Sequence, residues 1–169
     1  ITDKLKVEGR PFGVIYDASR RWYWVTLFET GELLGVDTQG QQVIAVKTPE
    51  TPRGLALTTD NRLLITHAMT GQLSIWSLAD TTPQLSTIIT LEETHHQDEF
   101  VSQGQPRLLD DIAISPDGQE AWLPHVLWNF DHSFQFQSTI FPAVSIVTLT
   151  PGEEAEKKGY RKELFKQIN

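Results

Sequence analysis

The sequence predicts an all-β fold, a partial β-propeller of about three four-stranded antiparallel blades. A pattern of short apolar runs recurs three times along the 169 residues, and repeats of this period are typical of propellers. The runs are rich in β-branched and aromatic residues and are separated by turn residues, as strands are. No helical periodicity of useful length precedes residue 150.

The repeat begins each time with an entry that contains proline and arginine. Gly54 follows Gly13 after 41 residues, and Asp111 occupies the matching place 57 residues later, so the third copy follows an insertion. A β-sandwich also uses short strands and turns, but it does not predict the same entry three times. The entries read Gly9-Arg10-Pro11-Phe12-Gly13, Thr51-Pro52-Arg53-Gly54 and Gln105-Pro106-Arg107.

Each copy contains four expected strands, the number found in a propeller blade. Asp60-Asn61 and Asp117-Gly118 are expected at hairpin turns, because Asn and Gly tolerate a positive φ. The blades are expected at 9–48, 49–92 and 106–168, within one propeller segment that spans 1–169. Their strands are expected at 12–17, 21–27, 32–37 and 41–47, then at 53–58, 62–67, 72–78 and 84–91, and finally at 108–115, 119–126, 143–149 and 160–167.

The segment before the last expected strand is highly charged and is interpreted as a solvated loop. A short amphipathic helix is the alternative to a strand at 160–167, although Gly159 disfavours a long helix. The charged residues of the loop are Glu153, Glu154, Glu156, Lys157 and Lys158.

The composition makes several functions improbable. The net charge of −8 disfavours binding to a phosphate backbone, and no apolar stretch approaches the ~20 residues of a membrane span. The absence of cysteine removes disulfides, thiolate metal sites and haem attachment through C-x-x-C-H. No phosphate loop or recognisable Ser/His/Asp set appears. Because the first residue is Ile1, we expect a processed chain or a piece of a longer one.

Two long excursions are expected on one face of the propeller. Loops alternate between the two ends of an up-and-down blade, so the connection at 92–105 and the insert at 126–142 lie at the same end. Long loops in compact domains are often functional. The junction of the second and third blades on this face is therefore the expected site.

Several histidines on this face are candidates for ligand or metal binding. His67 and His125 match each other at the ends of second strands; they are either ligands and proton carriers or caps that hydrogen-bond a strand. His95 and His96, with Asp98 and Glu99, either bind a divalent metal or belong to a solvated loop. Asp111 and His125 complete the weak metal candidates.

Charged residues at the blade entries form a second candidate set. Asp110 and Asp111 either hold calcium or a ligand amine, or make a turn or an ion pair with Arg107. Arg10, Arg53 and Arg107 either form a ring that faces a carboxylate, or join neighbouring blades.

The insert is the most unusual part of the sequence. A solvated loop would not select so many aromatic residues, because exposed apolar patches favour association. The insert is expected either to pack on the propeller or to dock a partner, for which aromatic residues are good anchors. Its candidate residues are Trp128, Phe130, Asp131, His132, Phe134 and Phe136.

Residues 9–37 and 52–78 resemble the repeat of the YVTN-type bacterial and archaeal β-propellers, a WD-like repeat. The closest matches to its Ser-Pro-Asp-Gly turn and Val-Ser-Val strand are 114–118 and 144–149. The first copy departs from the pattern at its turn, where Asp17-Ala18-Ser19-Arg20 stands. The long insert is similar to a subgroup whose larger members join a propeller to a c-type cytochrome or di-haem peroxidase-like region. The resemblance implies a periplasmic or extracellular protein that is an electron-transfer partner.

These observations predict a non-catalytic interaction segment of a larger, extracytoplasmic and redox-associated protein. No cofactor is expected in this segment apart from a possible divalent metal, and any haem is expected on a partner or another domain. Three blades do not close a ring, since propellers use 4–8, so the remaining blades are expected from the same polypeptide or another chain. The alternative is an enzyme or ligand site at the same blade junction.

Overall fold

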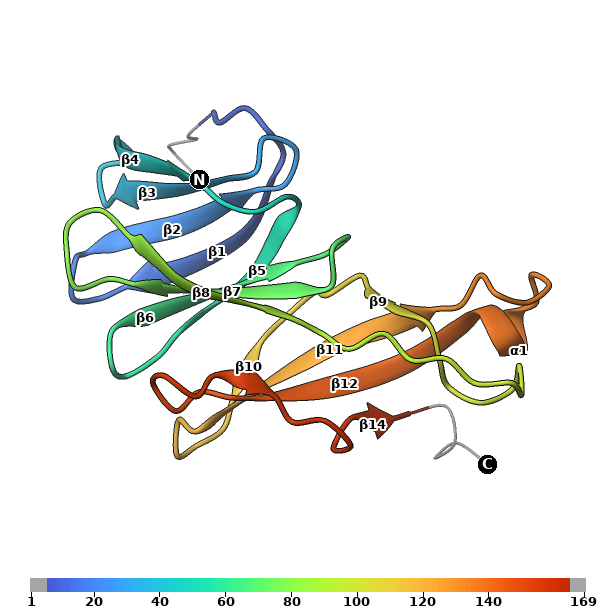
Figure 1. Ribbon diagram of the computed structural model, residues 1–169. Coiled ribbons are helices and arrows are strands. Elements are labelled where there is room, and N and C mark those ends of the chain that lie inside the picture. Colours follow the sequence, from blue (N-terminus) through green and yellow to red (C-terminus); the bar gives the residue numbers. More distant parts are fainter. Residues whose placement is uncertain (1–5, 165–169) are drawn as a thin grey trace.

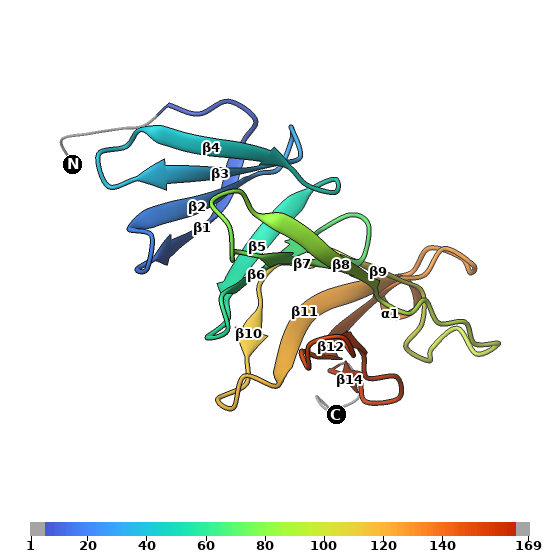
Figure 2. The same ribbon diagram turned by 60° about the vertical axis from the view of Figure 1, so that its left-hand side comes forward.

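A computed structural model describes residues 6–164 of the chain (Figure 1). Three antiparallel sheets stand side by side in chain order, with the second between the first and the third (Figures 1 and 2). In the described part of the chain the only α-helix is the single turn α1 (Phe136–Thr139). The all-β prediction and the three blades are confirmed.

The strands of the first two blades follow their expected boundaries to within one residue at each end. Each is a sheet in which strands adjacent in sequence pair in order. Blade 1 contains β1 (Pro11–Asp17), β2 (Trp22–Leu27), β3 (Glu32–Asp37) and β4 (Gln42–Lys47). Blade 2 contains β5 (Pro52–Leu57), β6 (Arg62–His67), β7 (Gln72–Ser77) and β8 (Gln84–Thr90).

Blade 3 keeps the four strand positions but interrupts the first and the last. Two short strands pair with β11 in the first position, and two pair with β12 in the last. The expected excursion at 126–142 is shortened to 129–139, because both central strands run into it. The strands are β9 (Gln105–Arg107), β10 (Ala113–Ile114), β11 (Glu120–Trp128), β12 (Ile140–Thr148), β13 (Ala155–Glu156) and β14 (Lys162–Glu163).

Two strand predictions for blade 3 were wrong. A continuous strand at 108–115 is not observed, because the first position of blade 3 is divided between β9 and β10 and residues 108–112 belong to neither. Within the described part of 160–167 only β14 is a strand, and residues 165–167 lie outside the described range. The charged loop also contributes a strand, since β13 falls inside it.

The backbone also corrects the alignment of the entry arginines. Arg10, Thr51 and Leu108 have φ values of 54°, 53° and 54°, and each precedes the Gly13, Gly54 or Asp111 position by three residues. The equivalent residues one place before that position are therefore Phe12, Arg53 and Asp110. Arg10, Arg53 and Arg107 thus occupy three different places in the repeat and do not form a ring.

The core lies between the blades. In each blade we call the face on the side of the preceding repeat the leading face, and the face on the side of the following repeat the trailing face. Trp24 and Leu33 of blade 1 pack on Leu63, Ile65 and Trp76 of blade 2. A second buried cluster joins blade 2 to blade 3, and its members include Leu64, Leu73, Ile75, Leu109, Leu123 and Val147. Removal of this apolar surface from water is what holds successive blades together.

Candidate functional site

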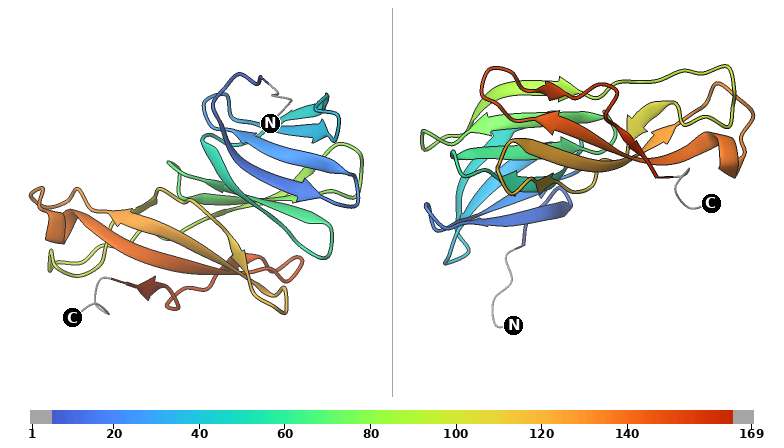
Figure 3. Two further views of the ribbon diagram at one scale, coloured as in Figure 1. Left: turned by 180° about the vertical axis from the view of Figure 1, so that it is seen from behind. Right: turned by 90° about the horizontal axis from the view of Figure 1, so that it is seen from below.

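The two long excursions meet at one end of blade 3. They are the loop 91–104 between β8 and β9 and the loop 129–139 between β11 and β12, yellow-green and orange in Figures 1 and 3. His95 Nδ1 lies 2.9 Å from Asp131 Oδ2. Gly104 has a φ of 115°, and a Cβ there would lie 2.3 Å from the Trp128 carbonyl oxygen. The loops are therefore in direct contact.

The second excursion exposes aromatic side chains from a braced backbone. Phe130 is 65% exposed and Phe134 is 79% exposed. Trp128 is half-buried and meets the Phe130 ring edge to face, with ring centroids 5.8 Å apart. The buried Asn129 side chain donates to the Ser138 carbonyl over 3.0 Å and accepts from the Asp131 amide over 3.1 Å. The loop therefore presents its phenylalanines on a fixed frame.

The sequence analysis also singled out His132 and Phe136 as candidate residues of the insert. His132 is half-buried, and its Nε2 has no hydrogen-bond partner within residues 6–164. The side chain of Phe136 lies outside the described part of the structure. In the first excursion Phe100 is 53% exposed, a position that the sequence reasoning did not single out although its aromatic character was visible.

His67 belongs to a closed hydrogen-bond network inside blade 2. Its Nδ1 lies 3.0 Å from the Glu50 carbonyl oxygen and its Nε2 lies 2.7 Å from Ser74 Oγ. A carbonyl only accepts, so Nδ1 carries the proton and Nε2 accepts from the serine hydroxyl. Trp76 Nε1 donates to the same Ser74 Oγ over 2.8 Å. Both ring nitrogens of His67 and the Ser74 hydroxyl therefore have partners, which supports the structural interpretation of His67.

His125 occupies the same repeat position, but the network around it has changed. Its Nδ1 donates to the Leu123 carbonyl over 2.9 Å, which leaves Nε2 as an acceptor. That Nε2 is buried and finds no partner within the described residues. Ser145, the counterpart of Ser74, instead donates to Glu156 Oε1 over 2.7 Å and accepts from Arg161 Nε over 3.0 Å.

The altered network adjoins a polar cavity between the loop 91–104 and blade 3. The cavity has a volume of about 230 Å³, and its lining includes Glu92, Thr94, His96, Glu156 and Arg161. Arg161 Nη2 donates to the Glu92 carbonyl over 2.6 Å and to Glu156 Oε1 over 2.8 Å. Glu156 also accepts from the Glu92 amide over 2.6 Å. Burial lowers the pKa of His125; the charge of Arg161 lowers it further, and that of Glu156 raises it.

Sequence reasoning missed this cluster. The Glu156 side chain is only 6% exposed and the Arg161 side chain 12%, although the segment was interpreted as a solvated loop. Glu156 and Glu92 lie 64 residues apart in sequence, so no local pattern links them. The correspondence of His125 with His67 was the one available signal.

The entry residues form a ladder across the first strands of the blades. The Arg53 guanidinium lies 4.1 Å from the centroid of the Phe12 ring, and its Nε lies 2.7 Å from Asp110 Oδ1. Arg53 of blade 2 thus contacts both blade 1 and blade 3. This supports the interpretation that this arginine joins neighbouring blades. Asp111 Oδ1 accepts from the Ile112 amide over 2.8 Å and makes a local turn.

The other two arginines and the expected metal ligands are dispersed. Arg10 pairs with Glu29 over 3.4 Å, while Arg107 hydrogen-bonds Gln105 two residues away instead of pairing with Asp110 or Asp111. Within residues 6–164 no group of three or more His, Asp or Glu side chains is arranged to hold a metal ion. The structure does not bring the weak metal candidates together; these are His95, His96, Asp111 and His125.

Acid is expected to destabilise the fold between pH 6.5 and about pH 4. Burial lowers the pKa of His67 and of His125 from 6.5 to about 4. As the pH falls through this window the unfolded chain takes up protons that the folded chain does not. The stability is therefore complete above pH 6.5 and is lost toward pH 4, with a loss at pH 5 of about 2 kcal/mol per histidine.

Urea unfolding at pH 7 and pH 5 measures this effect. The His67→Gln and His125→Gln variants are the controls, because each removes one titrating group. Each variant is expected to lose less stability than the wild type between the two pH values. A wild-type stability that is equal at pH 7 and pH 5 would contradict the burial of neutral imidazoles.

The comparisons with known proteins bear on the fold alone. No protein-family model and no curated protein matches the sequence. Hydrazine synthase from Kuenenia stuttgartiensis aligns with a TM-score of 0.55 at 12% identity, over 96% of this chain and 51% of that one. The Cps50 (Swd1) β-propeller domain from Myceliophteria thermophila aligns with a TM-score of 0.57 at 14% identity, over 90% and 44%.

A third solved structure is the periplasmic gluconolactonase PpgL from Pseudomonas aeruginosa. It aligns with a TM-score of 0.54 at 11% identity, over 88% of this chain and 52% of that one. The chain has a β-propeller fold and spans about half the length of these structures. Among the described residues there is no helix with the length and apolar character needed to cross a membrane.

Proposed function

We propose that the chain is a non-catalytic interaction segment of a β-propeller, which binds a protein partner through the loop 129–139. The observation that carries this proposal is the exposure of Phe130 and Phe134, at 65% and 79%. Large aromatic side chains in water are characteristic of binding surfaces, and they dominate the energy of interfaces when a partner buries them.

The frame beneath these rings favours docking over internal packing. Asn129 and Thr139 close the base of the loop through a backbone hydrogen bond of 2.9 Å, and Asp131 joins it to His95 of the neighbouring excursion. A surface held in one conformation loses less entropy on binding than a flexible loop does. The rings are thus exposed while the backbone that carries them is ordered.

The resemblance to YVTN-type propellers supports an extracytoplasmic, redox-associated setting for this function. In that setting the partner is a c-type cytochrome domain, which carries the haem, and the segment itself supplies a docking surface. The negative net charge of −8 is compatible with a basic partner, because complementary charge accelerates association.

Titration calorimetry with a purified basic c-type cytochrome tests the proposal. The Phe130→Ser/Phe134→Ser variant is expected to bind at least about tenfold more weakly than the wild type, as loss of anchor residues does. Leu85→Ser/Ile88→Ser is the matched control, because these β8 side chains are 45% and 41% exposed and lie outside the loop. Equal affinity of wild type and loop variant would contradict the surface, and no wild-type binding would contradict the partner class.

A small-ligand or enzyme site is the second candidate, favoured by the buried acceptor His125 Nε2 in a blade whose Ser145 hydrogen-bonds the cavity-lining residues Glu156 and Arg161. The cavity charges are paired with one another, and the unpartnered atoms in the described structure include Thr94 Oγ1 and His125 Nε2. A neutral ligand with hydroxyl groups fits this set. Calorimetric titration of glycerol and of glucose, with metal analysis alongside, tests it against His125→Phe; binding or stoichiometric metal that the variant loses would support this candidate.

A further inference from the structure

The two blade junctions repeat one polar contact at the first strands. Thr26 Oγ1 accepts from the Gly13 amide over 2.9 Å and donates to the Arg53 carbonyl over 2.7 Å. Thr66 Oγ1 accepts from the Gly54 amide over 2.8 Å and donates to the Asp110 carbonyl over 3.2 Å. In each case a threonine on the trailing side of one blade is joined to the first strand of the next.

The glycine in this contact is required by space. A Cβ on Gly13 would lie 2.2 Å from the Arg53 carbonyl oxygen, and one on Gly54 would lie 2.1 Å from that of Asp110. Only a residue without a side chain allows the next backbone to approach so closely. The trailing side of a blade therefore needs a glycine to admit the backbone of the next blade and a threonine to hydrogen-bond it.

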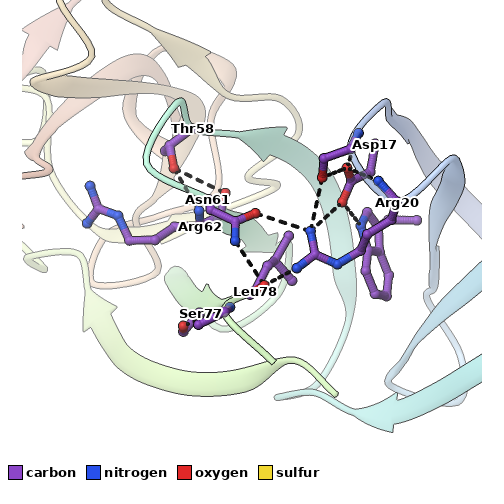
Figure 4. Close-up of polar contacts among 10 residues, drawn as sticks. Asp17, Arg20, Thr58, Asn61, Arg62, Ser77 and Leu78 are labelled. Atoms are coloured by element: carbon purple, nitrogen blue, oxygen red, sulfur yellow. Dashed lines mark hydrogen bonds and ion pairs between the residues drawn. The ribbon is translucent and has the colours of Figure 1, made fainter. Parts of the chain in front are cut away.

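A second repeated contact lies at the opposite end of the blades. Arg20 of blade 1 donates to the Leu78 carbonyl of blade 2 and to Asn61 Oδ1, the latter over 3.1 Å (Figure 4). Arg62 of blade 2 donates to the Leu149 carbonyl of blade 3 over 2.8 Å. Leu78 and Leu149 each follow the third strand of their blade directly, so both arginines reach the same point of the next blade, Arg62 from the first residue of β6 and Arg20 from two residues before β2.

The trailing side of blade 3 carries none of these groups at the matching positions. Asp111 stands in the glycine position, and Pro124 precedes His125 where Thr66 precedes His67. Glu120 begins β11 where Arg62 begins β6, and its carboxylate pairs with Lys157 of the same blade. Proline has no hydroxyl to donate, and glutamate has no proton to offer a carbonyl at neutral pH.

The leading side of blade 1, in contrast, has the positions whose main-chain carbonyls accept these hydrogen bonds in blades 2 and 3. Phe12 occupies the place of Arg53 and Asp110, and Thr38 follows β3 as Leu78 follows β7. The surface near them is apolar, with Val14 at 66% and Tyr23 at 41% exposure. A hollow of about 400 Å³ lies there, lined in part by Val14, Tyr23, Val36 and Thr38.

We propose that the leading face of blade 1 docks a β-propeller blade that carries a glycine, a threonine and an arginine at these three positions. The third blade of a second copy of the chain is not that partner, because it offers Asp111, Pro124 and Glu120 instead. The partner is a heterologous blade whose donors meet the Phe12 and Thr38 carbonyls. This surface is separate from the aromatic loop, so either proposal stands without the other.

Head-to-tail association of the chain tests the proposal directly. Asp111→Gly/Pro124→Thr/Glu120→Arg supplies the three missing groups on the trailing face. Sedimentation velocity is expected to show self-association of this variant at least about tenfold tighter than that of the wild type, a change of about 1.4 kcal/mol. Val14→Glu, added on the leading face, is expected to abolish the gain. An unchanged association constant in the triple variant, or a gain that Val14→Glu leaves intact, would overturn the proposal.

Cysteine cross-linking gives a second test that does not depend on the folding of the triple variant. The chain contains no cysteine, so Val14→Cys/Ala113→Cys introduces one pair. Ile15 and Leu55 belong to the same core cluster at the first junction, and Ala113 and Val14 are their counterparts on the free faces. No intermolecular disulfide between these positions is expected in the otherwise wild-type chain. Efficient cross-linking there would show that a second copy is the partner and would overturn the proposal.

Discussion

Replacement of Gly54 by alanine is expected to destabilise the protein by about 3 kcal/mol. The added Cβ would lie 2.1 Å from the Asp110 carbonyl oxygen, so the first strands of blades 2 and 3 must separate. Forced expansion of a packed interface costs about 1–3 kcal/mol. The separation also lengthens the hydrogen bond from Thr66 to Asp110, now 3.2 Å, which adds about 1 kcal/mol.

Urea unfolding followed by tryptophan fluorescence measures the change. Gly152→Ala is the matched control, since no described atom lies within 4 Å of its Cβ position. Because Gly152 has a φ of 83°, the control variant is expected to lose about 1 kcal/mol of stability through backbone strain alone. Equal losses in the two variants would mean that close approach between the blades does not constrain Gly54.

Replacement of Arg161 by methionine is expected to have an even larger effect, about 3–5 kcal/mol. The Arg161 side chain is 12% exposed and its partner Glu156 is 6% exposed, so the variant leaves a carboxylate buried without its cation. The Glu92 carbonyl and Ser145 each lose a hydrogen bond as well. Chemical unfolding at pH 7 checks the expectation.

Two further variants give the Arg161 prediction its reference points. Arg161→Met/Glu156→Gln removes the stranded charge and is expected to recover part of the loss. Lys47→Met breaks the ion pair with Glu32, in which the lysine side chain is 72% exposed, and is expected to cost less than about 1 kcal/mol. A loss in Arg161→Met no greater than that in Lys47→Met would mean that the buried pair is solvated.

Local patterns were sufficient for blades 1 and 2 because their strands are continuous. Period-two runs and turn residues mark β2, β3, β6 and β7 within one residue, since the alternation of faces is encoded locally. In blade 3 the first strand is divided into β9 and β10, with residues 108–112 between them. Asp110 and Asp111, which are turn-forming residues, stand inside this interval and were the local signal of the division.

The sequence predicted where the two long loops lie, whereas it did not predict the hydrogen-bond networks around them. The length of the two excursions and the aromatic insert pointed to the junction of blades 2 and 3, because loop parity in a blade is a topological rule. The arginines were matched by their prolines, and the backbone assigned them to three different repeat positions. The burial of Arg161 and Glu156 escaped notice because charged residues are ordinarily exposed, whereas in the fold these two bond each other, Glu92 and Ser145.

The sequence by itself determined the repeat, the all-β fold, the number of blades and the place of the long loops. These follow from residue-by-residue preferences for strand, turn and burial, which act over a few neighbours along the chain. Tertiary structure alone decided that His67 is satisfied while His125 is not, and that Gly13 and Gly54 receive a neighbouring backbone where Asp111 does not. Such differences depend on which groups from distant segments share one buried space, and hydrogen bonding and desolvation are settled only there.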